Sequence, residues 1–359
     1  MNHAHPRPRA RFHSAAARRP AWQAAVVAFG QALHGAFEPR RDESRAGLEV
    51  GVVGLSGVGK SSLLNALIAP ALDVLPSGGI GPLTGVPIRI RYAPVGTLRV
   101  TYLGGFVRQW HRDSTTAAFL AEIHDHVSGP RAADCETLEV GWPCPLLETG
   151  LTIVDLPGLG IVNDAYAAHT ETWLRQANAI LVVTDRAGIA DSVVSSLRRS
   201  GFLARVANGR ADLMGVVTKL DQVADDARRN DRSGATWSTC FRAIAERAET
   251  ELLEQLAAVL RYEQPRAEHL ASGRVQDAIR AFGVSSREHR RVVERDEEQR
   301  PKLHLAESSG VPSLRRALIA LGRLRSSAWT SELFDHVCAA PDRATLLPEL
   351  ISLVDMEGM

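Results

Sequence analysis

Three glycines and a lysine stand together in the stretch GLSGVGKSSLLNALI, residues 54–68, between an apolar run and an amphipathic segment. The stretch fits the pattern GxxxxGK[ST], in which glycines let backbone N–H groups turn toward phosphate oxygens. The start of the following helix adds a partial positive charge. The alternative is an ordinary strand-to-helix turn that uses its glycines only for tightness. We predict nucleotide contacts from Gly54, Ser56, Gly57, Val58, Gly59, Lys60, Ser61 and Ser62.

Two side chains of this stretch have particular roles in that prediction. Lys60 can reach the β- and γ-phosphates, and the Ser61 hydroxyl can bind Mg²⁺. Only three of the 42 basic residues are lysines, namely Lys60, Lys219 and Lys302. Arginine does not replace a compact ammonium on a flexible stem. The lysines that remain in so arginine-rich a chain therefore point to positions where lysine is required.

The segment VVTKLDQ, residues 216–222, supplies the candidate base-binding groups. A carboxylate at Asp221 can accept hydrogen bonds from the N1–H and the 2-amino group of guanine together, and adenine offers no such pair of donors. Lys219 can lay its aliphatic stem along the base. We predict guanine contacts from Thr218, Lys219 and Asp221. The alternative is an aspartate that merely caps a helix.

The segment TIVDLPG, residues 152–158, also places a polar cluster at the end of a predicted strand. Asp155 can bind Mg²⁺ through a water, and the Gly158 N–H can contact the γ-phosphate. Loss of that phosphate would release the following loop, which is how a nucleotide switch works. We therefore predict a metal site made by Ser61, Asp155 and the loop residue described next.

Two loops complete the predicted site. The glycine- and proline-rich stretch LPSGGIGPLTGVP, residues 75–87, is typical of a mobile loop. Its Thr84 is the candidate to close over Mg²⁺ and orient water, the alternative being an ordinary loop hydroxyl. The stretch FGVSS ends the last predicted strand, and backbone N–H groups at Ser285 and Ser286 could meet the guanine O6. This last signal is the least specific.

Composition limits the class of protein. The apolar fraction is 45%, and the net charge of +1 gives no whole-chain field that favours nucleic acid. No apolar run approaches the ~18 residues that a membrane-spanning helix needs. The four cysteines are far apart and fit reduced thiols in a cytosol. We predict a cytoplasmic protein with no nucleic-acid partner, and leave membrane-peripheral placement open.

Buried strands are expected within residues 48–56, 151–158, 179–185, 213–221 and 278–286, and long helices within 61–69, 115–129, 234–261 and 309–325. Residues 85–93 and 97–105 alternate apolar and polar side chains, as two strands of a hairpin do. Strands that alternate with helices predict an α/β fold with a mostly parallel sheet and helices on both faces. Ligands of such sheets bind at the carboxyl ends of the strands.

The chain is expected to have four parts. Residues 1–20 resemble a disordered tail, with a mitochondrial presequence as the less favoured alternative. Residues 21–47 predict a helix, residues 48–326 the nucleotide-binding domain, and residues 327–359 a short helical tail. The spacing of two puts His124 and His126 on different faces of a helix, so we predict solvated side chains rather than a metal site.

The order and spacing of these motifs resemble those of the dynamin-like large GTPases, as a bacterial-type or stalk-less member of the P-loop GTPase class. The resemblance covers about residues 48–325. It rests on GLSGVGKSS, on Thr84 three residues before Pro87, on VDLPGL, on VVTKLD and on the closing segment SSGVPSLRRAL. It implies GTP hydrolysis, Mg²⁺ and a homodimer across the nucleotide face. The short chain after the closing helix argues against direct membrane binding.

Three positions depart from the family pattern. Ser56 stands where the eukaryotic members have a water-positioning glutamine, Gly57 replaces a residue that supports a monovalent cation, and Leu159 replaces the glutamine of small GTPases. The resemblance then implies slow intrinsic turnover, with Thr84, Ser56 and Lys60 as catalytic residues and an arginine from a partner completing the site. Such an arginine accelerates hydrolysis by ~10³–10⁵. The alternatives are a GTP-binding interaction module with negligible hydrolysis and, less favoured, an ATP-dependent protein.

Overall fold

The computed structural model describes residues 48–77, 86–112, 115–158, 164–185, 188–208, 210–230, 234–263, 279–295 and 299–325. Residues 46–326 form one compact unit. The predicted tail, the predicted helix at 21–47, the loop residue Thr84 and the predicted segment 327–359 lie outside the described residues.

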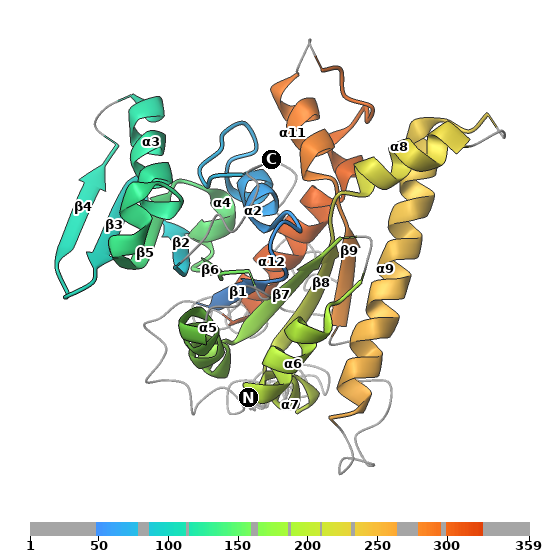
Figure 1. Cartoon of the computed structure of the whole chain (residues 1–359). Coiled ribbons are helices and arrows are strands. Elements are labelled where there is room, and N and C mark those ends of the chain that lie inside the picture. Colours follow the sequence, from blue (N-terminus) through green and yellow to red (C-terminus); the bar gives the residue numbers. More distant parts are fainter. Residues whose placement is uncertain are drawn as a thin grey trace, which may run out of the picture. The chain divides into compact units, whose positions relative to one another are not determined.

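Nine described strands form one sheet in the order β4-β3-β5-β2-β6-β1-β7-β8-β9 (Figure 1). They are β1 Glu49–Val53, β2 Ile88–Tyr92, β3 Thr97–Tyr102, β4 Val107–His111, β5 Cys135–Trp142, β6 Thr152–Asp155, β7 Ala179–Thr184, β8 Asp212–Val217 and β9 Ile279–Gly283. The five strands β6, β1, β7, β8 and β9 are parallel to one another, whereas β2 pairs with β6 in the antiparallel direction. Their carboxyl ends, where the predicted motifs begin, therefore meet at one edge of the sheet.

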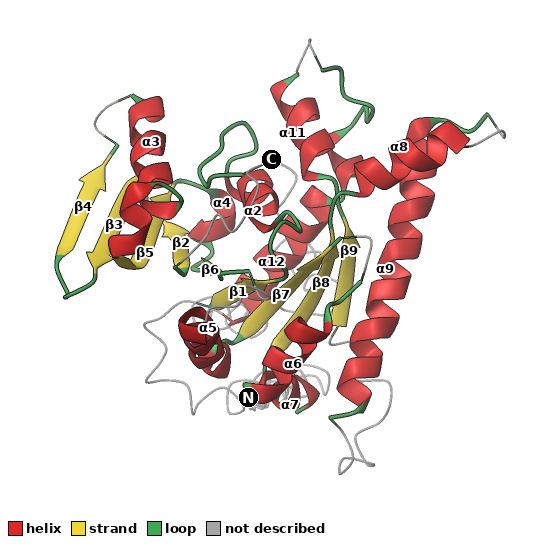
Figure 2. Cartoon of the chain, in the orientation of Figure 1, coloured by secondary structure: helices red, strands yellow, loops and turns green. Residues whose placement is uncertain are grey.

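Helices lie on both faces of the sheet, as predicted (Figure 2). They are α2 Lys60–Ile68, α3 Thr116–Val127, α4 Pro145–Glu148, α5 Asp164–Gln176, α6 Asp191–Arg199, α7 Phe202–Ala207, α8 Leu220–Asn230, α9 Trp237–Arg261, α11 Ser286–Glu294 and α12 Val311–Arg325, with 3₁₀ turns η2 Pro130–Asp134 and η3 Ala306–Ser309. One apolar core contains side chains of α2, α3, α4 and α12, and the other contains side chains of α5 to α9. The chain thus has the α/β fold of the P-loop GTPases.

Continuous apolar runs predicted the central strands correctly because these strands are buried on both faces of the sheet. Every residue of β7 is buried, because helices cover both sides of a parallel strand. In β1 the side chains of Val50 and Val52 enter one core and Val53 enters the other. Between them, a Cβ built on Gly51 would lie 2.1 Å from the ring of Trp173 in α5. The absence of a side chain at Gly51 therefore lets α5 pack directly on the sheet.

The predicted hairpin of residues 85–93 and 97–105 is wrong. Both segments are strands, β2 and β3, but β5 lies between them and pairs with each. Leu138 of β5 is opposite Ile88 on one side and Val100 on the other, and all three are buried. The hairpin partner of β3 is instead β4. Local alternation identifies a strand but not its neighbour, because a later strand can enter between two consecutive ones.

The solvated position predicted for the histidines of α3 is also wrong for His126, which is fully buried. Its Nε2 lies 2.8 Å from the Tyr102 hydroxyl and its Nδ1 lies 2.8 Å from the Glu122 carbonyl oxygen. The cause is that α3 packs this face on the β3–β4 hairpin, where Trp110 also contacts the imidazole. Within the part of the chain that the structure describes, no three His, Cys, Asp or Glu side chains cluster to hold a metal.

Candidate nucleotide-binding site

The loop between β1 and α2 has the backbone that a phosphate cradle needs. Gly57 and Gly59 adopt φ values of 77° and 96°, a region that side chains disfavour. A Cβ at Gly54 would lie 2.3 Å from the Val183 carbonyl oxygen, so the loop passes close over β7. The first turn of α2 has no side-chain cap and no acidic residue. Its N–H groups are therefore free of internal anionic partners and suit an external anion.

Lys60 begins α2 and folds back over the loop. Its Nζ donates hydrogen bonds to the carbonyl oxygens of Gly54 at 3.2 Å and Leu55 at 3.0 Å. Burial lowers the pKa of Lys60, and the negative charge of Asp155 partly offsets this effect. The ammonium is thus held by backbone oxygens at the point where the pattern places the terminal phosphates.

Asp155 ends β6 and is fully buried next to α2. The Ser61 hydroxyl donates a hydrogen bond to its Oδ2 at 3.4 Å, while its Oδ1 has no partner among the described residues. Burial raises the pKa of Asp155 to about 6, against the opposing effects of Lys60 and Ser61. An orphaned buried carboxylate oxygen beside a hydroxyl is a donor set that Mg²⁺ accepts. The residues present therefore fit a magnesium ion.

Gly158 brings the loop after β6 against the phosphate loop. A Cβ at Gly158 would lie 2.9 Å from the backbone nitrogen of Ser56 and 3.0 Å from its Cα. Only a residue without a side chain fits there without displacement. The DLPG segment and the phosphate loop therefore share one wall of the site, and Leu159, which follows, lies outside the described residues.

Thr218 connects the predicted base-binding loop to the phosphate loop. Its buried hydroxyl lies within hydrogen-bond distance of the carbonyl oxygens of Val58 and Thr184. The next residue, Lys219, has a left-handed backbone with φ 57°, which is rare for a residue with a side chain. Its stem lies beside Gly59, and its Nζ is 3.7 Å from Asp185. The strained turn at Lys219 thus directs its side chain along the phosphate loop.

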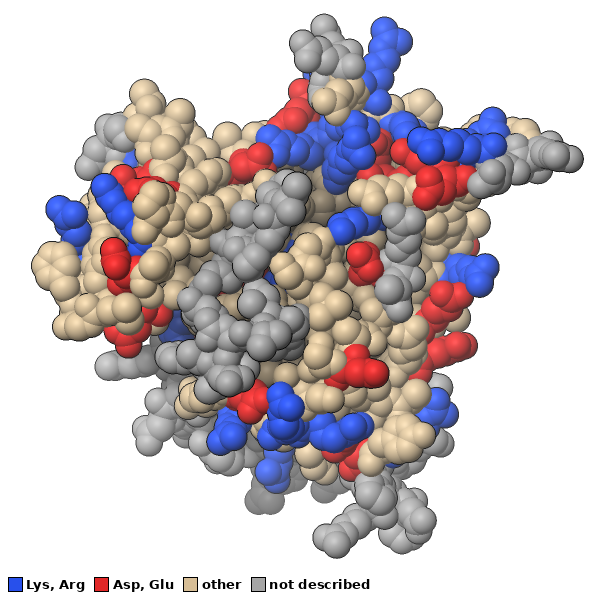
Figure 3. Space-filling view, in the orientation of Figure 1, with Lys and Arg blue, Asp and Glu red and all other residues tan. Residues whose placement is uncertain are grey.

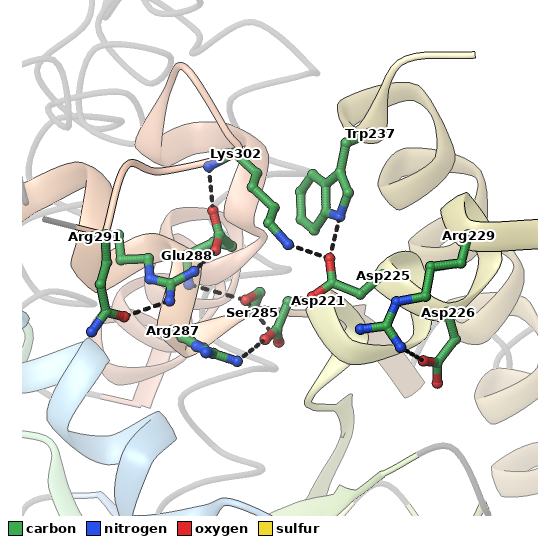
Figure 4. Close-up of polar contacts among 11 residues, drawn as sticks. Asp221, Asp225, Asp226, Arg229, Trp237, Ser285, Arg287, Glu288, Arg291 and Lys302 are labelled. Atoms are coloured by element: carbon green, nitrogen blue, oxygen red, sulfur yellow. Dashed lines mark hydrogen bonds and ion pairs between the residues drawn. The ribbon is translucent and has the colours of Figure 1, made fainter. Parts of the chain in front are cut away.

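Asp221 begins α8 and faces the start of α11 (Figure 4). The Ser285 hydroxyl donates to Asp221 Oδ1 at 3.0 Å, and the Arg287 guanidinium lies 3.6 Å from Oδ2. Ser285 is fully buried and also caps α11 by accepting from the Glu288 N–H. The Ser286 hydroxyl is buried without a partner among the described residues. Ser285 thus contacts Asp221 through its side chain, and the predicted contact of the Ser285 and Ser286 backbone N–H groups with the guanine O6 stays a prediction.

Lys302, the third lysine, contacts the helices that carry Asp221 and Arg287. Its Nζ pairs with Asp225 of α8 and lies 5.4 Å from the ring centre of Trp237 at the start of α9. Its backbone N–H donates to Glu288, which is buried and paired with Arg291 (Figure 4). These contacts hold α8, α9 and α11 together, so Lys302 has a structural role.

The structure brings most of the predicted site residues to the carboxyl edge of the sheet. The phosphate loop, Asp155, Gly158, Thr218 and Lys219 are linked by the contacts above, and Asp221 with Ser285 adjoins them through the same loop. Thr84 lies outside the described residues, so its place in the site stays a prediction. Sequence reasoning missed Arg287, whose only signal was its position two residues after Ser285.

A phosphate loop, a buried aspartate that ends the neighbouring strand and a TKLD loop on a mostly parallel sheet define a P-loop GTPase-type nucleotide-binding domain. Comparison with known proteins agrees with this class, since residues 50–220 match the model of the dynamin family. Over these residues the chain is similar to the dynamin family. The family and the geometry together support GTP binding.

Individual relatives match only part of the chain. The isoniazid-induced protein IniA of Mycobacterium tuberculosis is 34% identical over 146 residues, which are 38% of this chain and 21% of that protein. An uncharacterized protein in the xynA 3′ region of Caldicellulosiruptor sp. is 26% identical over 171 residues, 47% of this chain and 39% of that protein. The chain thus spans between a fifth and two fifths of the length of these relatives.

Two solved structures match the chain at low sequence identity and low TM-score. One is an oligomerised bacterial dynamin pair, with a TM-score of 0.49 and 15% identity over 94% of this chain and 55% of that one. The other is Toc33 from Arabidopsis thaliana, with a TM-score of 0.40 and 14% identity over 84% of this chain and 93% of that one.

Proposed function

We propose that the chain binds magnesium-associated GTP at this edge and hydrolyses it to GDP and phosphate. One observation carries the proposal above all. Asp155, beside Ser61 and Lys60, keeps a buried carboxylate oxygen that has no partner among the described residues. Burial of an unpartnered charged oxygen is unfavourable, and a bound cation would relieve it. The contact of Thr218 with the Val58 carbonyl oxygen, which joins the TKLD loop to the phosphate loop, supports the proposal further.

The proposed roles follow from chemistry and position. Ser61, Asp155 and Thr84 would hold Mg²⁺, which as a Lewis acid neutralises charge that develops on the phosphates. Lys60 would neutralise the same oxygens after leaving the Gly54 and Leu55 carbonyls. Thr84 and Ser56 would orient the attacking water. The Gly158 N–H would contact the γ-phosphate, so that its loss releases the loop behind it.

The assembly of the protein is also a proposal. The family resemblance supports a homodimer across the nucleotide face, with residues 48–326 as the functional domain. A partner's arginine could complete the site, because no glutamine occupies position 56 or 159. Within the described part of the chain, no helix is both long and apolar enough to cross a lipid bilayer. We propose a cytoplasmic protein and leave a peripheral association with membranes to experiment.

A second candidate is a GTP-binding module with negligible hydrolysis. The observation that favours it is the same absence of glutamine, with Ser56 and Leu159 in its place. Such a module would assemble in the GTP state and dissociate slowly.

Phosphate release from GTP, measured at several protein concentrations, tests the proposal and separates the two candidates. A rate per molecule that rises with concentration identifies an enzyme activated by dimerisation, and a flat, near-zero rate identifies the module. Lys60→Ala is the control, since it should abolish tight nucleotide binding. If that variant keeps the wild-type affinity, the phosphate-loop assignment is wrong. Equal competition by ATP against labelled GTP would instead overturn the assignment of guanine.

A further inference from the structure

We infer that Arg287 occupies the base-recognition carboxylate of Asp221 when no nucleotide is bound, and that guanine must displace it. Arg287 would then be a specificity-determining gate rather than a nucleotide contact. This inference rests on the proposed function, because it assumes that Asp221 receives the base.

The two oxygens of the Asp221 carboxylate have different partners, and Oδ2 is the one that faces Arg287. Oδ1 of Asp221 accepts the Ser285 hydroxyl at 3.0 Å, and both groups are buried. Oδ2 lies 3.6 Å from Nη1 of Arg287 (Figure 4). The side chain of Asp221 is 7% exposed and that of Arg287 is 56% exposed. The buried Asp221 carboxylate is therefore paired with an arginine side chain that is largely exposed and can move into solvent.

The guanidinium of Arg287 and the edge of guanine present similar pairs of hydrogen-bond donors. A guanidinium presents N–H groups on neighbouring nitrogens of one carbon, in a planar fork that matches a carboxylate. The N1–H and 2-amino group of guanine are also two donors on neighbouring nitrogens of one carbon. A guanine bound at Asp221 would need the oxygen that the Arg287 guanidinium faces, so Arg287 and guanine compete for that oxygen. Adenine lacks this donor pair and cannot replace the arginine.

The sign of the effect distinguishes a gate from ordinary electrostatics. Basic side chains gather over α11, which contributes Arg287, Arg290 and Arg291 and is followed by Arg295 at its C-cap (Figure 3). A positive charge near a triphosphate normally strengthens its binding, so its removal should weaken binding. A gate predicts the opposite, because removal of Arg287 frees Asp221 for the base.

The test is the binding of a fluorescent N-methylanthraniloyl GDP to the full chain, by titration and by stopped flow. Arg287→Ala and Arg287→Gln should each bind about two- to fivefold more tightly than the wild type, as expected for displacing one partly exposed ion pair. The gain should lie mainly in a faster association rate, and it should shrink as NaCl screens the pair. Arg229→Ala is the matched control, since it removes an exposed arginine of α8 that pairs with Asp226.

The same comparison in a protein that carries Asp221→Asn tests whether the effect of Arg287 depends on the Asp221 carboxylate. In Asp221→Asn the removal of Arg287 should bring no gain, because the charged acceptor is already lost. Equal or weaker binding by both Arg287 variants would overturn the gate, and so would an equal gain in the two backgrounds. If the wild type and every variant fail to bind the probe, the proposed function itself is wrong, and that outcome is distinct from failure of the gate.

Discussion

The hydroxyl of Thr218 contacts the carbonyl oxygen of Val58, a residue 160 positions earlier in the chain. This buried contact joins the loop predicted to bind the base to the loop predicted to bind the phosphates. A second acceptor, the Thr184 carbonyl oxygen, lies 3.0 Å away on the neighbouring strand. The two recognition loops are therefore positioned as one unit.

Replacement of Thr218 tests this coupling. Thr218→Val keeps the shape of the side chain but leaves the buried Val58 carbonyl without its donor, a loss of about 1–3 kcal/mol. We expect weaker binding of both GTP and GDP, because the phosphate loop loses its support in either state. The measurement is the dissociation constant of each nucleotide. Thr218→Ser keeps the hydroxyl and should bind nearly as the wild type does, and equal defects in both variants would contradict the role of the hydroxyl.

Asp155→Asn separates stability from function. The neutral amide removes a buried charge whose pKa is raised to about 6, each unit being worth about 1.4 kcal/mol. Above pH 7, without Mg²⁺ or nucleotide, we expect the variant to be more stable to urea by about 1–3 kcal/mol. Magnesium-dependent hydrolysis should fall at the same time. A variant less stable than the wild type would show that the carboxylate is better satisfied than its contacts indicate.

Asp221→Asn should change the base that is recognised. The amide cannot accept from two donors of guanine, so affinity for GTP should fall at least about tenfold. Xanthosine triphosphate, whose C2 oxygen accepts from an amide, should bind better than it does to the wild type. Competition of both nucleotides against a fluorescent analogue measures the preference. An unchanged preference would place Asp221 away from the base.

Thr84→Ala examines a residue outside the described part of the chain. If Thr84 closes over Mg²⁺ mainly during hydrolysis, its loss should lower turnover more than GTP binding. The comparison is kcat against the dissociation constant of a non-hydrolysable GTP analogue. Equal losses in both quantities would count against the proposed role.

His289 predicts a specific dependence of stability on pH. It is buried in α11 with Nδ1 3.0 Å from the Ser309 hydroxyl, and burial, assisted by the charge of Arg315, lowers its pKa to about 4. An unfolded histidine has a pKa near 6.5, so between about pH 6.5 and 4 the unfolded chain binds more protons. Stability should therefore fall as pH falls through this window, by up to about 1.4 kcal/mol per pH unit.

His289→Asn should flatten that dependence, because asparagine does not titrate. Urea unfolding at pH 7.0 and pH 5.0 measures the difference for each protein. The matched control is the exposed His304→Asn, which should keep the wild-type slope. If His289→Asn and the wild type lose equal stability between the two pH values, another group causes the acid sensitivity.

The central half of the fold could be predicted because its signals are local. A buried parallel strand such as β7 is an uninterrupted apolar run, and the phosphate loop combines three adjacent constraints on backbone, charge and helix start. The outer half could not, because the partner of β3 is decided by β5, more than thirty residues later. His126 was misplaced for the same reason, since its burial depends on a hairpin that spacing along α3 does not reveal.

The candidate site also contains residues that the local sequence predicts and contacts that only tertiary packing determines. Asp155 and Asp221 could be found because Asp155 ends an apolar strand run and Asp221 lies four residues after the end of another. The contact of Ser285 with Asp221 and the position of Arg287 depend on how α8 and α11 face each other. Lys302, which contacts Trp237 and pairs with Asp225 of α8, supports that orientation. The rarity of lysine singles out Lys302 in the sequence but does not reveal these partners.

The close approach of Gly51 to Trp173 has a consequence for how this lineage can change. A methyl group at position 51 would overlap the indole, at 2.1 Å from its nearest atom. Neither position can therefore drift independently: a homologue that gains bulk at 51 must first, or simultaneously, carry a smaller residue at 173. An alignment of relatives should show these two sites substituting in tandem, with their volumes inversely correlated.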